Sequence, residues 1–400
     1  MKDRPIGPFG PGFISAASDA DPTTVASLAV VGAATGYMLS WLVVLLLPMI
    51  AVTQSIAAAV GASRTSIQEA IKHRFGASWA WLALVAVVSV NLMTLGADIE
   101  AGGESLSLLT GVPRDVFLIP FAGAVAWLLL RRSYLRVERF LSYLPFIFIC
   151  YGVSALLAKP DWAALLHSLL FPHFEFTTTV ATAALALLGT TLTSYVYYWE
   201  SIEVSERGTQ PAQARAMKAD AAWGALAPGI CFFFILVATT ATLGKTHVAI
   251  QTATDAAVAL RPLAGGWATA LFAVGLLGSA AIAVPVLAGT CAYAVTQTLA
   301  RPGSLDAAPR EARLFYAVAT GSLAFATAIA FVGVPPIALL YWASVAGGLA
   351  TPLTLWLLVA VANDRAIMGE NHIRKPLAIA GAAVAAIVTI SCAIFLATLI

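Results

Sequence analysis

Apolar residues occur along the chain in eleven long runs that are separated by short polar segments. A bilayer core about 30 Å thick is crossed by about 20 residues of helix. The predicted spans are residues 9–36, 38–60, 78–108, 115–130, 140–158, 177–206, 221–243, 264–299, 314–333, 337–361 and 376–399. The longest polar segments, 159–176 and 244–263, are predicted to be outer loops. The pattern indicates an all-α membrane protein with one transmembrane domain over residues 1–400.

The composition supports this class and excludes others. Hydrophobic residues make up 60% of the chain and charged residues only 10%, compared with roughly 25% charged residues in soluble domains. A net charge of +2 gives no general attraction to nucleic acid. The four cysteines lie inside apolar runs without CxxC spacing, which favours packing over disulfides or metal binding.

The distribution of positive charge predicts a cytoplasmic N-terminus. Of the 22 lysines and arginines, only four fall in the loops on the other side: Arg114, Lys159, Lys245 and Arg261. This asymmetry follows the positive-inside rule. Asp19 and Asp21 interrupt the first run, so we interpret it as a transmembrane helix and not as a signal peptide. The short termini fit the plasma membrane of a prokaryote.

Two of the spans contain helix-breaking sequences. In the first, Asp21 precedes Pro22, which removes a backbone donor and disfavours helix at the residue before it. A charge at mid-depth in a bilayer is costly and usually functional, although a simple proline kink is the alternative. In the sixth span, Gly189 is followed by a cluster of threonines. Paired interruptions of this kind favour a transporter with inverted repeats, here about 8–158 and 177–361, with 376–399 as an extra helix.

The residues at these breaks favour a hard cation. Asp21 supplies a negative charge, and no sulfur or imidazole lies nearby in the sequence. The neutral oxygens are the hydroxyls of Thr24, Thr190 and Thr193 and the backbone carbonyls near Ala20 and Gly189. An all-oxygen site with one carboxylate suits Mg²⁺, Ca²⁺ or Mn²⁺.

Further acidic residues could line an ion pathway. In the third span, Asn91, Thr94 and Asp98 share one helical face. Glu100 and Glu104 form a second stripe that could attract cations from outside, although Glu104 could equally be an interfacial charge. Asp19 lies just cytoplasmic of Asp21, and Glu200 lies in the inner half of the sixth span, where it could instead pair with Arg207.

Several motifs resemble one transporter family. They are Gly10-Pro11-Gly12-Phe13, Asp21-Pro22, Gly36 to Trp41, Ala97-Asp98-Ile99-Glu100 and Gly189 to Ser201. Together they resemble the natural-resistance-associated macrophage protein (Nramp) family of divalent metal transporters, by motif over about the first half of the chain. The resemblance implies a leucine-transporter-like fold of eleven helices, with helices 1 and 6 unwound, and transport by alternating access.

The site implied by the resemblance differs from the family pattern. The family's Asp-Pro-Gly-Asn becomes Asp21-Pro22-Thr23-Thr24, its alanine carbonyl ligand falls on Thr190, and its methionine ligand falls on Thr193. Two family histidines fall on Tyr195 and Glu200. The loss of the thioether resembles the Nramp-related magnesium transporter branch, and the missing histidines argue against proton coupling.

We therefore predict a Mg²⁺ importer with Mn²⁺ as a co-substrate, no cofactor and a monomer as the sufficient unit. One alternative is a proton-coupled Mn²⁺ or Fe²⁺ importer of the main branch. Another is a carrier of small organic amines or amino acids, with the aromatic residues 195 and 197–199 stacking on the substrate. An enzyme is the least supported class, because the sequence has no HExxH and no nucleotide motif.

Overall fold

The computed structural model describes residues 19–131, 149–206, 226–244, 250 and 252–400. All regular elements within these ranges are helices. Seven segments of this part are long and apolar enough to cross a membrane, as judged by length and composition. They contain α3 (Ser40–Ala62), α5 (Ala77–Thr110), α10 (Thr178–Thr191) with α11 (Ser194–Glu206), α16 (Ala268–Thr298), α17 (Arg313–Ala330), α18 (Pro336–Ala362) and α20 (Lys375–Ala397).

The other four predicted spans correspond to shorter helices. These are α2 (Pro22–Thr35), α6 (Asp115–Leu130), α8 (Ile149–Leu157) and α13 (Leu226–Thr242). The first parts of the predicted spans that contain α2, α8 and α13 lie outside the described residues. The ends of the remaining helices agree with the predicted spans to within a few residues.

Some segments that the hydrophobic pattern leaves as loops contain short helices. They are α4 (Ile67–Phe75), α9 (Trp162–Leu170), α14 (Ala253–Ala257), α15 (Arg261–Ala264) and α19 (Arg365–Met368). In α4 the Ser66 side chain accepts from the backbone of Glu69, whose side chain accepts from Ser66 in return. This capping box satisfies helix donors that would otherwise lack a partner. The spacing Ser-x-x-Glu was therefore a visible signal for a helix too polar to be found by hydrophobicity.

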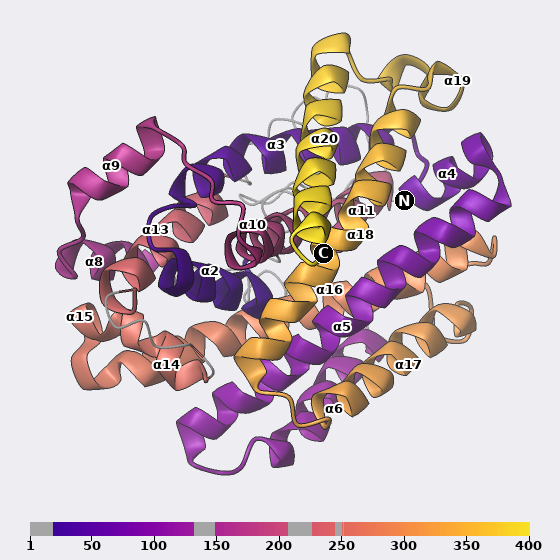
Figure 1. Cartoon of the computed structure of the whole chain (residues 1–400). Helices are drawn as coiled ribbons and strands as arrows, with labels where there is room; N and C mark the ends of the chain where they lie inside the picture. The colour runs from indigo at the N-terminus through magenta and orange to yellow at the C-terminus, as the bar shows by residue number, and fades with distance from the viewer. Residues whose placement is uncertain (1–18, 132–148, 207–225, 245–249, 251) are drawn as a thin grey trace.

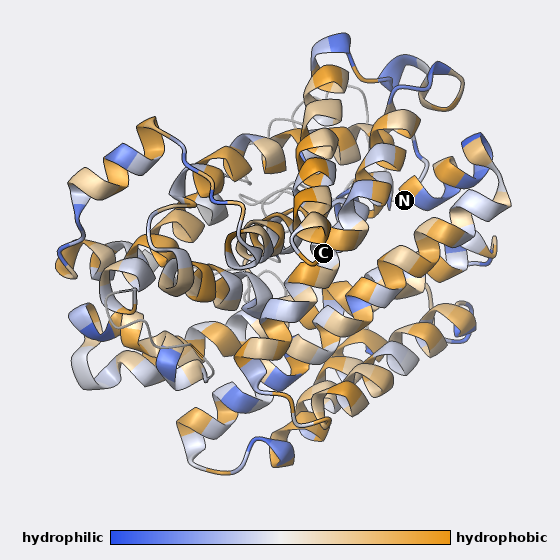
Figure 2. Cartoon of the chain, in the orientation of Figure 1, coloured by the Kyte–Doolittle hydropathy of each residue, from blue (hydrophilic) through white to orange (hydrophobic). Residues whose placement is uncertain are grey.

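The helix α10 lies near the centre of the molecule in Figure 1, where it contacts α2, α18 and α20. The long helix α5 packs against α16, α17 and α18. Figure 2 shows hydrophobic residues along most of the long helices and hydrophilic residues mainly near their ends and in the connections, including the segment around α19. This distribution is the one expected of helices that cross a bilayer.

The helices break at the two predicted positions. Asp19 is helical, Ala20 and Asp21 are not, and α2 begins at Pro22. Leu192 and Thr193 separate α10 from α11. The carbonyl of Ala20 is bound by a neighbouring helix, since it accepts from the Ser279 hydroxyl. The Thr351 hydroxyl donates to the carbonyl of Gly347 at 2.7 Å and lies 3.5 Å from that of Leu192. Such pairing makes irregular backbone tolerable at membrane depth.

Candidate functional site

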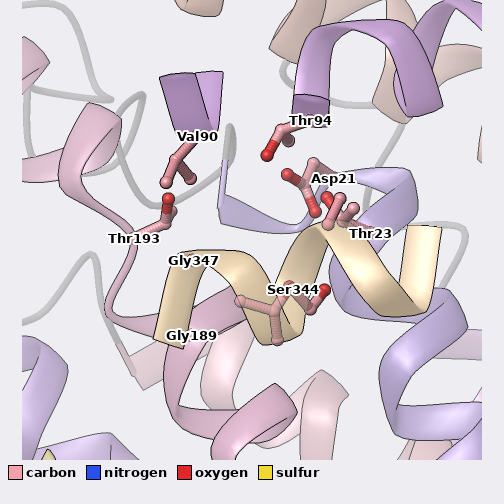
Figure 3. A pocket seen from close by; sticks show the side chains of 10 residues that line it. Asp21, Thr23, Val90, Thr94, Gly189, Thr193, Ser344 and Gly347 are labelled. Atoms are coloured by element: carbon pink, nitrogen blue, oxygen red, sulfur yellow. The ribbon is translucent and has the colours of Figure 1, made fainter. Parts of the chain in front are cut away.

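A small pocket lies where the two breaks meet α5 and α18. It is lined by Asp21, Thr23, Val90, Thr94, Gly189, Thr190, Thr193, Ala343, Ser344 and Gly347. Figure 3 shows Asp21, Thr23 and Thr94 on one side of this pocket, and Thr193 and Val90 on the other. The volume open to the centre of a water molecule is about 10 Å³, which is close to what one water needs. The pocket in this conformation therefore holds about one water or one bare ion.

The polar lining is made of oxygen atoms only. One carboxylate, from Asp21, is accompanied by the hydroxyls of four threonines and one serine, and the lining side chains contain neither sulfur nor nitrogen. Within the described part of the chain, no three His, Cys, Asp or Glu side chains group closely enough to hold a metal ion. A cation in this pocket would thus depend on a single charge and several neutral hard donors.

The carboxylate of Asp21 is held by two hydrogen bonds from different helices. Asp21 is the N-cap of α2, where its Oδ1 accepts from the backbone N–H of Thr24 at 2.7 Å. An aspartate at this position, followed by proline, is favourable for starting a helix. Its Oδ2 accepts from the hydroxyl of Tyr195, at the start of α11, at 3.0 Å. Only 1% of Asp21 is exposed, so its orientation is closely defined.

The threonine hydroxyls near Asp21 point in different directions. The Oγ1 atoms of Thr24 and Thr190 lie 2.8 Å apart and form a hydrogen bond. Thr24 itself does not line the pocket, whereas Thr23 does, because neighbouring residues of a helix point in different directions. The buried Thr23 lies beside the carboxyl groups of Asp21 and Asp98. The predicted ligand Thr24 is therefore placed one step behind the pocket wall.

Gly189 brings α10 unusually close to α18. A Cβ atom added at this position would lie 2.1 Å from the carbonyl oxygen of Ser344 and 2.2 Å from the backbone nitrogen of Gly348. Small residues permit such close contact between membrane helices. The Gly189 carbonyl faces the same helix, since a Cβ on Gly347 would lie 2.9 Å from it. The backbone carbonyls of Ala20 and Gly189, which were predicted to bind the cation, thus both have close protein neighbours already.

Two of the predicted accessory carboxylates lie near Asp21. Asp19 and Asp98 are at most 1% exposed, and each lies close enough to Asp21 for electrostatic interaction. The carboxylate oxygens of Asp19 have no hydrogen-bond partner in the part of the chain that the structure describes. Asp98 also lies beside Thr23. Several buried acidic side chains therefore surround the start of α2, although only Asp21 lines the pocket.

The other predicted acidic residues lie elsewhere. Glu100 is buried and forms an ion pair with Arg114, just before α6. Glu104, one turn further along α5, is half-buried. Glu200 is buried in α11 and does not line the pocket. Glu100 is thus paired with a protein cation, and the role of this stripe in attracting metal ions stays a prediction.

The aromatic cluster after the second break packs against other helices. The hydroxyl of Tyr197 donates to Oγ1 of Thr354 at 2.5 Å, and that of Tyr198 donates to Oε1 of Gln68 at 3.2 Å. The Trp199 ring packs edge-on against Tyr293, with 6.2 Å between ring centroids. These three rings do not line the pocket, so they are not arranged to stack on a substrate there.

Three pocket residues with hydroxyl groups, Thr23, Thr94 and Ser344, were not singled out by the sequence as donors. Thr23 was only part of the motif that follows Asp21. Thr94 was placed on the polar face of the third span but not at a metal site. Ser344 lies in an apolar span that contains no charge. The only available signal was that Ser344 lies three and four residues before Gly347 and Gly348, on the same helical face, where small residues indicate close helix contact.

Comparisons with known proteins agree with this architecture. Residues 12–398 match the family profile described as natural resistance-associated macrophage protein-like. The chain is 28% identical over 386 residues to the divalent metal cation transporter MntH of Mycobacterium tuberculosis, covering 91% of this chain and 85% of that protein. The MntH of Deinococcus radiodurans is 29% identical over 301 residues, or 72% of this chain and 68% of that protein.

Solved structures show the same fold. A point mutant of the Eremococcus coleocola manganese transporter aligns with a TM-score of 0.75 and 18% identity, covering 96% of this chain and 84% of that chain. MhsT in complex with L-phenylalanine aligns with a TM-score of 0.59 and 14% identity, covering 97% and 98% of the two chains. The expected fold class, a leucine-transporter-like bundle with two broken helices, is confirmed.

Proposed function

Since the chain belongs to the Nramp family, whose profile matches residues 12–398, we propose that it imports divalent metal cations by alternating access. Its main substrate is Mg²⁺, and Mn²⁺ is a co-substrate. The named relatives are divalent metal cation transporters, and the solved neighbour is a manganese transporter. The choice of Mg²⁺ goes further than those names and is argued from the pocket.

The observation that carries this proposal is the all-oxygen lining of the pocket. A thioether ligand favours softer transition metals over hard ions. Thr193 lines the pocket at the position where the family pattern has that ligand, and every other polar side chain there is also an oxygen donor. Such a site has little means of excluding Mg²⁺, which is a hard cation with a strong preference for oxygen.

Import of Mg²⁺ does not need a coupled proton. Two positive charges crossing a potential of about 100 mV gain roughly 4.6 kcal/mol. The residues at the positions of the two family histidines are Tyr195 and Glu200, and the neutral phenol of Tyr195 is a hydrogen-bond donor to Asp21. We therefore propose that the membrane potential and the ion gradient drive import.

The rival function is proton-coupled import of Mn²⁺. It is favoured by Asp19 and Asp98, which are buried close to Asp21. Such carboxylates could take up protons. A carrier of organic amines or amino acids has less support, because a volume of about 10 Å³ is too small for such a substrate in this conformation.

The test is uptake into proteoliposomes at a clamped membrane potential, with internal Mg²⁺ and Mn²⁺ indicators and a pH dye. We expect saturable Mg²⁺ entry without acidification. The variant Asp21→Asn should abolish uptake, since it removes the charge but keeps a side chain that caps helices equally well. Asp161→Asn is the matched control, because Asp161 caps α9 through the backbone of Ala164 away from the pocket.

Two outcomes would contradict the proposal. Mn²⁺ entry with acidification and no competition by millimolar Mg²⁺ would assign the chain to the proton-coupled main branch. Undiminished uptake by Asp21→Asn would show that the pocket is not the transport site. Loss of uptake in Asp161→Asn as well would indicate general damage from changing a helix cap, and would remove Asp21→Asn as support.

A further inference from the structure

Tyr195 reaches from the start of α11 to the carboxylate at the start of α2. Its hydroxyl donates to Oδ2 of Asp21 at 3.0 Å, and its side chain is fully buried. The other carboxylate oxygen accepts from the backbone of Thr24 at 2.7 Å. Each oxygen of Asp21 is thus held by a donor from a different half-helix.

This contact is made from outside the pocket. Tyr195 is not among the lining residues, whereas Asp21 is. A carboxylate oxygen has two lone-pair directions, so Oδ2 can accept from Tyr195 and still present its second lone pair to the pocket. The phenol therefore orients the carboxylate without taking the place of an ion.

We propose that Tyr195 is the positioning residue of the cation site, acting through Asp21; this inference rests on the proposed function. Asp19 and Asp98 lie close to Asp21 and would repel its carboxylate. Tyr195 also lies within electrostatic range of all three carboxyl groups. Its hydrogen bond holds Asp21 in one orientation, in which the second lone pair of Oδ2 is left for a cation.

The expected effect of removing this bond is a loss of metal affinity. Hydrogen-bond partners that orient a metal-ligating carboxylate typically contribute 10- to 100-fold to affinity. In Tyr195→Phe the ring and its packing are kept, and a single oxygen atom is lost. We expect the KM for both Mg²⁺ and Mn²⁺ to rise about tenfold or more, with a much smaller change in the maximal rate.

The chain offers a closely matched control. Tyr197 lies two residues further along α11, is equally buried, and donates its hydroxyl to Thr354 of α18. Tyr197→Phe therefore removes the same atom from the same helix without touching Asp21. We expect its KM values to stay within about twofold of those of the unmodified protein, because Tyr197 does not act on a ligand.

The experiment combines uptake with metal-dependent melting. Purified proteins are heated in detergent with MgCl₂ or MnCl₂ at increasing concentration, and the rise in melting temperature reports binding to the folded state. Tyr195→Phe should need about tenfold more of either salt for the same rise, while its metal-free melting temperature shows whether it folds. Tyr195→His, which keeps a ring N–H donor, should lose less affinity than Tyr195→Phe and is the second variant if the phenylalanine fails to fold.

The outcomes separate this inference from the proposed function. If the unmodified protein neither takes up nor responds to Mg²⁺ or Mn²⁺, the proposed function fails and the inference fails with it. If it responds but Tyr195→Phe has an unchanged concentration dependence, the positioning role alone is overturned. Equal losses of metal affinity in Tyr195→Phe and Tyr197→Phe would also overturn it, since they would reflect the general effect of removing a buried hydroxyl.

Discussion

The close contact between α10 and α18 allows a sharp test of how the pocket is built. In Gly189→Ala, the new Cβ would lie 2.1 Å from the carbonyl oxygen of Ser344, 2.2 Å from the nitrogen of Gly348 and 2.6 Å from its Cα. Favourable contacts between heavy atoms are about 3.5 to 4 Å. All three neighbouring atoms belong to the backbone, so the clash cannot be relieved by turning a side chain. The two helices must move apart by about 1 Å or more.

The cost of this displacement should be large for a single methyl group. Adding methylene groups to well-packed interiors typically destabilises a protein by about 1–3 kcal/mol, and occasionally by more. The displaced wall contains Ser344 and Gly347, which line the pocket. We therefore expect Gly189→Ala both to lower the apparent melting temperature in detergent and to raise the KM for Mg²⁺ uptake.

Glycines elsewhere in the helices provide the control. Gly123 in α6 and Gly321 in α17 have nothing within 4 Å of an added Cβ. Alanine at these positions should be neutral or stabilise by up to about 1 kcal/mol, because alanine is the better helix former. If Gly189→Ala melted at the same temperature as Gly123→Ala and Gly321→Ala, the close approach of α10 and α18 described above would be wrong.

Three further predictions concern other parts of the molecule. Gln68→Leu should destabilise the protein by about 1–3 kcal/mol, because Gln68 donates to the carbonyl of Ala80 at 2.6 Å and to Thr298 Oγ1 at 2.7 Å and accepts from Tyr198. Thermal unfolding measures this loss against the control Gln54→Leu, since the buried Oε1 of Gln54 has no partner among the described residues. Arg114→Met should cost about 3–5 kcal/mol because it leaves Glu100 as a buried charge, and the double variant with Glu100→Gln should recover most of this stability; no recovery in melting experiments would contradict the pairing. Thr193→Met should shift uptake from Mg²⁺ toward Mn²⁺ because it adds a softer donor to the pocket, and competition between the two ions during uptake measures this shift.

Much of this architecture could be predicted from the sequence, because the lipid environment imposes strong patterns. Apolar runs of membrane length predicted the long helices, and the Asp21-Pro22 pair predicted where the first helix breaks. The short helix α4 was missed because it is only nine residues long and too polar on average to be read as a membrane span. It begins at a capping box and buries Ile67, Ala70 and Ile71 together with Gln68.

The candidate site was harder to predict at the level of single side chains. The sequence identified the two breaks but could not give the rotation of α2, which places Thr23 at the pocket and turns Thr24 toward Thr190. It also could not show that Glu100 contacts Arg114, because that contact joins the side of α5 to the turn before α6. The hydrogen bond from the Tyr195 hydroxyl to Asp21 likewise depends on how the helices pack, since 174 residues separate the two in sequence.

If the pocket is the transport site, its size indicates which part of it must move. Mg²⁺ usually keeps several of its waters in protein sites, whereas the volume of about 10 Å³ accommodates about one. The pocket wall formed by α10 and α18 is packed backbone against backbone at Gly189, with no space between the two helices there. The break at Ala20, by contrast, is held by an exchangeable hydroxyl bond from Ser279. At the other break the Thr351 hydroxyl lies 3.5 Å from the carbonyl of Leu192 and is bonded to Gly347 instead. A hydrated ion can replace such bonds with its own waters, so we expect the pocket to widen at the breaks while α10 and α18 stay together.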